Sequence, residues 1–236
     1  MFDPIIEFAT SILAALTELI TPFAGPNAAA LAIILLTCGV RLLLLPLSLA
    51  AARGERARAR LAPRIQRLHE RYRRDPERLR RELAALYAAE GTTPLAGCLP
   101  SLAQTPFFIL VYQVASAPST HTLFGAPLGQ PLAAVVAVSG PFSVPVLVFA
   151  VLLTLLTVVA WTASRRARLM AAAAPQTPAG EASLETVRKL TPLLPYGAVA
   201  AGAVLPLGAG LYLLASTTWT MLERVLLYPK PTAVQA

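Results

Sequence analysis

Arg41 is the side chain with the clearest chemical potential, because it lies within an almost wholly apolar stretch from Ala28 to Ala52. A helix needs about 20 apolar residues to cross a bilayer, and this stretch is long enough. At about 1.5 Å per residue, Arg41 would lie about 20 Å from one end and about 16 Å from the other. Its side chain reaches only about 7 Å and cannot snorkel to either headgroup layer. A charge at that depth costs at least about 2.5 kcal/mol.

Something must therefore compensate the charge of Arg41, either a buried acid or a water-filled cavity. The other apolar stretches carry no Asp or Glu near their middle. We therefore expect a wet pocket with a cationic wall, to which Thr37, one turn earlier on the same face, contributes. The alternative is an arginine that binds helix carbonyls and polar side chains for packing alone.

Further polar residues lie in two other apolar stretches. They are Gln104, and the run Ser216, Thr217 and Thr218. These side chains can line the same pocket. Small hydroxyl residues also mediate helix packing in membranes, so the sequence leaves both roles open for the Ser/Thr run.

An arginine-rich segment, residues 53–90, holds twelve arginines against six acids. Its leucines recur at helical spacing, and Asp75-Pro76-Glu77 is typical of a helix start. We predict a two-helix hairpin with cationic outer faces. Such a surface rests on anionic headgroups, and it can also dock an acidic or nascent chain or ribosomal RNA. The candidate docking residues are Arg64, Arg67, Arg71, Arg73, Arg74 and Arg78.

Other chemistries find no support in the sequence. It has no glycine-rich phosphate loop with a lysine, and His69 and His121 stand apart from other metal-ligating residues. Cys38 and Cys98 are interpreted as small buried residues rather than a disulfide. We therefore expect no enzyme activity, no metal and no cofactor.

Composition and charge set the expected architecture. Hydrophobic residues make up 56% and charged residues 14% of the 236, which is typical of an integral membrane protein. Segments 53–93 and 164–189 hold seventeen of the twenty Lys and Arg residues, whereas 1–27, 117–141 and 201–208 hold none. By the positive-inside rule, the N-terminus lies outside and the C-terminus in the cytoplasm.

We thus predict an all-α protein with five transmembrane helices around a hydrophilic groove. The predicted parts are an extracytoplasmic amphipathic segment at the membrane surface (1–27), the first span (28–52), a cytoplasmic helical hairpin (53–93), the second span (94–116), an extracytoplasmic loop (117–141), the third span (142–163), a cytoplasmic loop (164–189), the fourth span (190–205), an extracytoplasmic turn (206–208), the fifth span (209–227) and a cytoplasmic tail (228–236).

Three blocks of this sequence resemble the YidC family of membrane protein insertases. The first is IILLTCGVRLLLLPLSL (33–49), with its arginine and the proline that follows. The second and most specific is 61–114, with an Asp-Pro turn, the junction EGTTPLAGCLP and the pair Gln104-x-Pro106. The third, LPLGAGLYLLASTTW (205–219), has the pattern Pro-x-Gly-x-x-x-Tyr.

The resemblance implies five core helices around a groove that is open to the cytoplasm and to lipid and closed towards the outside. It makes Arg41 the groove arginine and puts Gln104 and Tyr212 at matching polar positions. The implied activity is insertion and folding of small proteins in the bacterial plasma membrane without nucleotide hydrolysis. The implied partners are nascent membrane proteins, the Sec translocon, the ribosome and the signal recognition particle pathway. The run Ser216–Thr218 departs from the asparagines of many members.

Two other classes of function remain open from the residues alone. A small transporter or channel for an anionic solute would use Arg41 as its binding charge. The odd number of predicted spans argues against it, because many transporters carry an inverted repeat. A structural factor that only scaffolds other membrane proteins is the second alternative.

Overall fold

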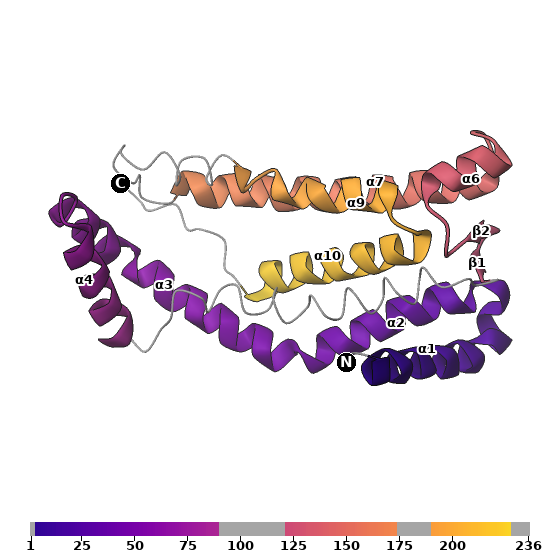
Figure 1. The fold of residues 1–236 in the computed structure, drawn as a ribbon, viewed down its shortest axis with the longest axis horizontal. Coiled ribbons are helices and arrows are strands. Elements are labelled where there is room, and N and C mark those ends of the chain that lie inside the picture. Colours follow the sequence, from indigo (N-terminus) through magenta and orange to yellow (C-terminus); the bar gives the residue numbers. More distant parts are fainter. Residues whose placement is uncertain (1–2, 90–120, 174–189, 228–236) are drawn as a thin grey trace.

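The structure is a computed structural model that describes residues 3–89, 121–173 and 190–227. The predicted second span (94–116), with Gln104, and the tail (228–236) lie outside these residues. Most of the described chain is helical (Figure 1). The elements are α1 (Asp3–Ala24), η1 (Gly25–Asn27), α2 (Ala28–Leu43), α3 (Leu45–Arg71), α4 (Pro76–Ala89), β1 (Thr122–Leu123), β2 (Ala126–Pro127), α6 (Leu132–Ser139), α7 (Val144–Ala173), η2 (Leu194–Tyr196), α9 (Gly197–Val204) and α10 (Leu207–Leu227).

Two helical stretches of the described residues are long and apolar enough to cross a membrane. They are Thr10–Leu43, in which most of α1 and all of α2 run in opposite directions on either side of η1 (Figure 1), and Val144–Leu169 within α7. The segment Leu194–Val204 is a shorter apolar helix. The predicted fourth span is thus short as a helix, because Pro192 and Pro195 lie in its first turns and its regular part begins only at Gly197.

Helix α1 packs antiparallel along α2 (Figure 1). The reversal occurs at Gly25, whose φ of 52° suits glycine and which begins the 3-10 turn η1, followed by Pro26. Thr17 of α1 is buried, whereas Glu7 and Glu18 are exposed. The predicted location of this segment at the membrane surface stays a prediction. The side-by-side contact with α2 is a tertiary interaction that periodicity within one segment does not report.

The first predicted span is divided at Leu44, where α2 ends and α3 begins. The break precedes Pro46, which has no N–H to donate and whose ring would clash with the carbonyl four residues earlier. Beyond the break, α3 continues without interruption across residue 52 into the arginine-rich segment. The structure therefore has no helix boundary where the predicted span ends and the predicted hairpin begins.

The turn between α3 and α4 has a local cause in the sequence. The Oδ1 of Asp75 accepts a hydrogen bond from the backbone N–H of Arg78 at 3.0 Å, and Pro76 is the first residue of α4. An acid at this position satisfies one of the free N–H groups at the start of a helix. The packing of α3 against α4 is thus fixed at the tip of the pair.

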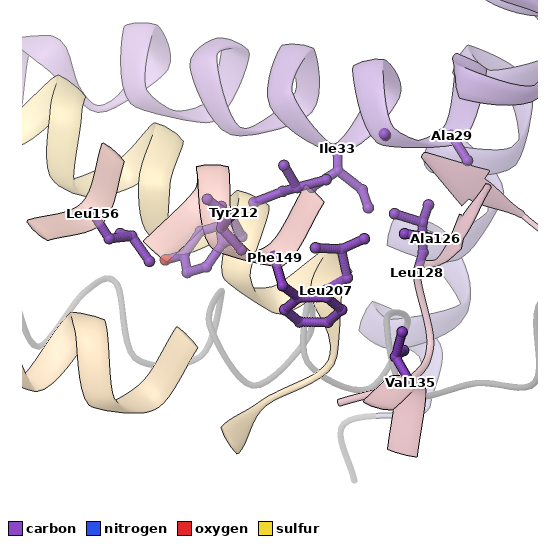
Figure 2. Packing of buried hydrophobic residues seen from close by; sticks show 12 residues of the cluster. Ala29, Ile33, Ala126, Leu128, Val135, Phe149, Leu156, Leu207 and Tyr212 are labelled. Carbon is purple, nitrogen blue, oxygen red and sulfur yellow. The ribbon is translucent and has the colours of Figure 1, made fainter. Parts of the chain in front are cut away.

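The apolar core lies where α2, α7 and α10 meet the segment 126–135 (Figure 2). Phe149 and Leu207 are fully buried at its centre. Two glycines permit very close helix contacts on the α7 side. A Cβ atom at Gly202 of α9 would lie 2.7 Å from Leu156 Cδ1, and one at Gly210 of α10 would lie 2.6 Å from Leu152 Cδ2.

Hydrogen bonds close one end of the bundle, near the β1–β2 hairpin. The backbone N–H groups of Leu207 and Gly208, at the start of α10, donate to Gln130 O and Leu128 O at 3.1 and 2.9 Å. The N–H of Phe124 donates to Oδ1 of Asn27 at 2.8 Å. This end therefore ties the α1–α2 junction, the hairpin and α10 together.

We expect Gly210→Val to destabilise the protein by about 1–3 kcal/mol, because its side chain would overlap the buried Leu152. Thermal unfolding in detergent measures the effect. Gly39→Val is the matched control, since a Cβ at Gly39 of α2 meets nothing within 4 Å. Equal losses in the two variants would contradict the close helix contact.

We expect Asn27→Ala to speed hydrogen exchange at the amide of Phe124, because the substitution removes its acceptor. The stability cost should be about 0.5–1.5 kcal/mol. Asn27→Asp retains an acceptor oxygen and should retain protection. Unchanged exchange in Asn27→Ala would show that this bond does not hold the hairpin.

Candidate functional site

The guanidinium of Arg41 joins α2 to α10. Its Nη2 donates to three oxygens: the backbone O of Ser216 at 3.0 Å, Oγ of Ser216 at 2.7 Å and Oγ1 of Thr220 at 2.8 Å. The helices α2 and α10 pack side by side, which brings residues distant in the sequence together. Arg41 is thus held by hydroxyl and carbonyl groups of one neighbouring helix.

The acceptors on α10 are arranged by the helix itself. Ser216 and Thr220 lie one turn apart on the same face, and Thr220 Oγ1 also donates to Ser216 O at 2.9 Å. Ser216 belonged to the predicted site, whereas Thr220 did not. Thr220 is four residues after Ser216 and therefore lies on the same face of the helix. The sequence could have indicated its role only if it were already known that Ser216 faces α2.

The hydrogen bonds that Arg41 makes to α10 go to neutral oxygens rather than to a carboxylate. Glu223 of α10 interacts with Arg41 electrostatically. Its Oε1 accepts a hydrogen bond from Trp219 Nε1 at 2.7 Å, which orients the acid along its own helix. The positive charge is therefore held within hydrogen-bonding oxygens and is attracted by an acid one turn beyond Thr220.

The guanidinium has more N–H donors than these contacts use. The Nε atom of Arg41 is buried and has no hydrogen-bond partner among residues 3–89, 121–173 and 190–227. A buried donor without a partner costs about 1–3 kcal/mol. The site is therefore suited to an additional acceptor such as water or a carboxylate oxygen.

The other predicted groove residues occupy different surroundings. Thr37 is buried and its hydroxyl donates to Ile33 O at 2.7 Å, while Thr217 donates to Leu213 O at 2.6 Å. Their hydroxyl hydrogens are thus bound within their own helices. Thr218 is exposed.

Tyr212 is 2% exposed and belongs to the apolar core, where Figure 2 shows it among Phe149, Leu156 and Leu207. It also interacts electrostatically with Arg41. The ring of Tyr212 is thus part of the apolar core rather than of an open groove wall. The structure does not describe Gln104.

A cavity of about 250 Å³ lies on the other side of α10, between that helix, α7 and the η2–α9 segment. Thr220 is on its wall and is also the residue that accepts a hydrogen bond from Arg41. The cavity and the arginine therefore share one side chain.

The predicted docking arginines are exposed along α3, the tip and the start of α4. They are Arg64, Arg67, Arg71, Arg73, Arg74 and Arg78. At the tip, the guanidinium carbons of Arg71 and Arg78 lie 5.8 and 5.3 Å from the centre of the Tyr72 ring. These distances are typical of cation–π contacts, so the ring holds two of the charges in place. In the described chain no three His, Cys, Asp or Glu side chains gather as a metal site requires.

Known proteins share long stretches of this sequence, and the relatives described here are each named "Membrane protein insertase YidC". The protein of Streptomyces avermitilis is 38% identical over 103 residues, which are 44% of this chain and 24% of the relative. That of Acidiphilium cryptum is 43% identical over 83 residues, 35% of this chain and 14% of the relative. That of Francisella tularensis subsp. novicida is 45% identical over 84 residues, 36% of this chain and 15% of the relative.

The matched parts thus span about a quarter or less of the length of these relatives. A family model covers far more of the chain. The model described as "60Kd inner membrane protein" matches residues 19–233, nearly the full sequence. Together with the apolar helices, this match identifies an integral membrane protein. The chain belongs to the 60Kd inner membrane protein family, the YidC family that its three sequence blocks resemble.

Proposed function

We propose that this chain is an insertase and chaperone for small membrane proteins. The observation that carries the proposal is the site of Arg41. A guanidinium in the last turn of the apolar helix α2 is held by neutral oxygens, and its Nε has no acceptor among the described residues. Such a site can bind an acidic side chain of an incoming polypeptide.

Electrostatics explains how such a site lowers the barrier to insertion. A polar segment entering hydrocarbon loses its hydration, at several kcal/mol for each charged group. A hydrated cation within the membrane shortens the apolar path and attracts acids on that segment. The adjoining apolar stretch then leaves sideways into lipid, driven by burial at about 25 cal/mol per Å². No nucleotide hydrolysis is required.

The closed end of the bundle supports a groove with one entrance. The hydrogen bonds from the N–H groups of Leu207 and Gly208 to the 128–130 segment satisfy backbone donors at the start of α10. The arginine-rich helices α3 and α4 lie towards the opposite end (Figure 1). We propose that this basic end faces the cytoplasm, with the N-terminus outside, and that residues 94–116 complete five spans in the bacterial plasma membrane.

The proposed partners follow from the same charges. Nascent membrane proteins are the substrates, and the α3–α4 pair docks the ribosome, the signal recognition particle pathway or anionic lipids. Cooperation with the Sec translocon is part of the proposal. No specific nucleic-acid target is included, because Arg71 and Arg78 already cover the ring of Tyr72 at the tip of the α3–α4 pair.

We expect Arg41→Ala to reduce insertion of a single-span substrate with an acidic leader into liposomes at least tenfold. The lost free energy of that change is about 1.4 kcal/mol. Arg41→Lys keeps the charge and should retain part of the activity. The matched control is Arg168→Ala, which removes an exposed arginine of α7.

Unchanged insertion in Arg41→Ala would refute the proposed role of the cation and would favour a scaffolding factor. Flux of an anionic solute through liposomes, lost in Arg41→Ala, would favour the transporter instead. A leader in which the acid is replaced by an amide separates the two. Its insertion should be less sensitive to Arg41→Ala.

We expect the triple variant Arg71→Gln, Arg74→Gln and Arg78→Gln to weaken binding of ribosome–nascent-chain complexes by at least tenfold at low salt. Each arginine near an anionic surface contributes about 1 kcal/mol. Co-sedimentation with the full chain in lipid nanodiscs measures the binding. Neutralising Arg165, Arg166 and Arg168 of α7 is the control, and an equal loss there would show that only total charge matters.

A further inference from the structure

The cavity beside α10 has a defined lining, which shares Thr220 with the contacts of Arg41. It lies between three packed elements, α7, the η2–α9 segment and α10, and has a volume of about 250 Å³. Most of its wall is apolar. The lining residues are Leu156, Val159, Ala160 and Ala163 of α7, Leu194, Pro195 and Ala198 of η2–α9, and Thr217, Thr220, Met221 and Arg224 of α10.

The polar residues that line the cavity differ in what they can offer a ligand. The hydroxyls of Thr217 and Thr220 donate to backbone oxygens of α10, at 2.6 and 2.9 Å, so they offer the cavity no hydrogen-bond donor. Arg224 brings a positive charge and is exposed. Leu156, in contrast, is buried, with only 1% of its surface exposed. The cavity is therefore amphiphilic, with an apolar interior and a cationic edge.

The cationic edge lies at the end of α10. Arg224 is in the last turn of α10, at the end that faces the arginine-rich helices (Figure 1). On the neighbouring α7, the guanidinium of Arg165 lies 5.6 Å from the ring centre of Trp161, which is 53% exposed. Tryptophan and arginine are enriched at the membrane–water boundary. Phosphate groups of lipids are found at the same level.

The size of the cavity suits a hydrocarbon chain. A volume of about 250 Å³ has room for one narrow chain along the apolar wall. Leu194 on its wall is 72% exposed, so the cavity reaches the surface on the lipid side.

We propose that this cavity binds an anionic phospholipid. One acyl chain lies against Leu156, Ala160 and Ala198, and the phosphate lies on Arg224. The charge of Arg224 supplies the preference for an anionic headgroup, and the apolar wall holds the chain. The proposal does not depend on insertase activity, since it uses only the membrane location of the protein.

Tryptophan fluorescence tests the proposal, because the two tryptophans of the chain, Trp161 and Trp219, adjoin the cavity-lining Ala160 and Thr220. The full chain is placed in nanodiscs with a small fraction of either brominated phosphatidylglycerol or brominated phosphatidylcholine. Bulk lipid quenches Trp161 equally in both cases. We expect half-maximal quenching at about fivefold less brominated phosphatidylglycerol.

Two variants separate headgroup from chain. Arg224→Gln should abolish the preference for phosphatidylglycerol, and Arg168→Gln, which removes an exposed arginine at the end of α7, should retain it. Ala198→Leu fills the cavity and should reduce the lipid-specific quenching while the charge remains. Circular dichroism and elution volume show that each variant is folded.

Equal quenching by the two lipids in the unaltered protein would overturn the proposal and leave the cavity to a side chain of a polypeptide. A preference that survives Arg224→Gln would overturn the headgroup assignment. Equal loss in Arg168→Gln would show attraction by overall charge, and undiminished quenching in Ala198→Leu would exclude the cavity. The last two outcomes also overturn the site.

Discussion

The hydrogen bonds from Arg41 to Ser216 and Thr220 are the constraint on which the rest of the structure depends. They join α2 to α10 and fix how far one helix is displaced along the other. They also keep a charge away from bulk water at a cost that neutral oxygens only partly offset. The bundle around this contact must therefore be well packed, to hold the two helices together.

The two ends of the bundle differ in the groups that they present. At the hairpin end, backbone donors of α10 and Phe124 are satisfied by Leu128, Gln130 and Asn27. At the other end, α10 finishes with Arg224 and α7 carries Arg165 beside Trp161. One end is thus closed by short-range hydrogen bonds, and the other carries long-range charge. A polypeptide or a lipid headgroup with negative charge is attracted to only one of them.

Local sequence signals could be read without a structure, and long-range ones could not. Asp75 and Pro76 mark the start of α4 because a helix cap depends on adjacent residues. Arg41 could also be identified from neighbouring residues alone, because it is a single charged residue in an apolar run. Thr220 required knowledge of which face of α10 meets α2, and the packing of α1 along α2 required tertiary contact. Tyr212 is polar in the sequence, yet its ring lies in the core.

The close contacts at Gly202 and Gly210 and the hydrogen bonds of Arg41 hold α10 against its neighbours in two different ways. Along α7, α9 and α10 the helices touch through dispersion contacts between backbone and leucine methyl groups, at distances that only a residue without a Cβ permits. Between α2 and α10 the polar part of the contact is a set of hydrogen bonds that water can replace almost one for one. Helix α10 therefore lies between an apolar contact that depends on the absence of a side chain and a polar contact whose hydrogen bonds can be exchanged for water.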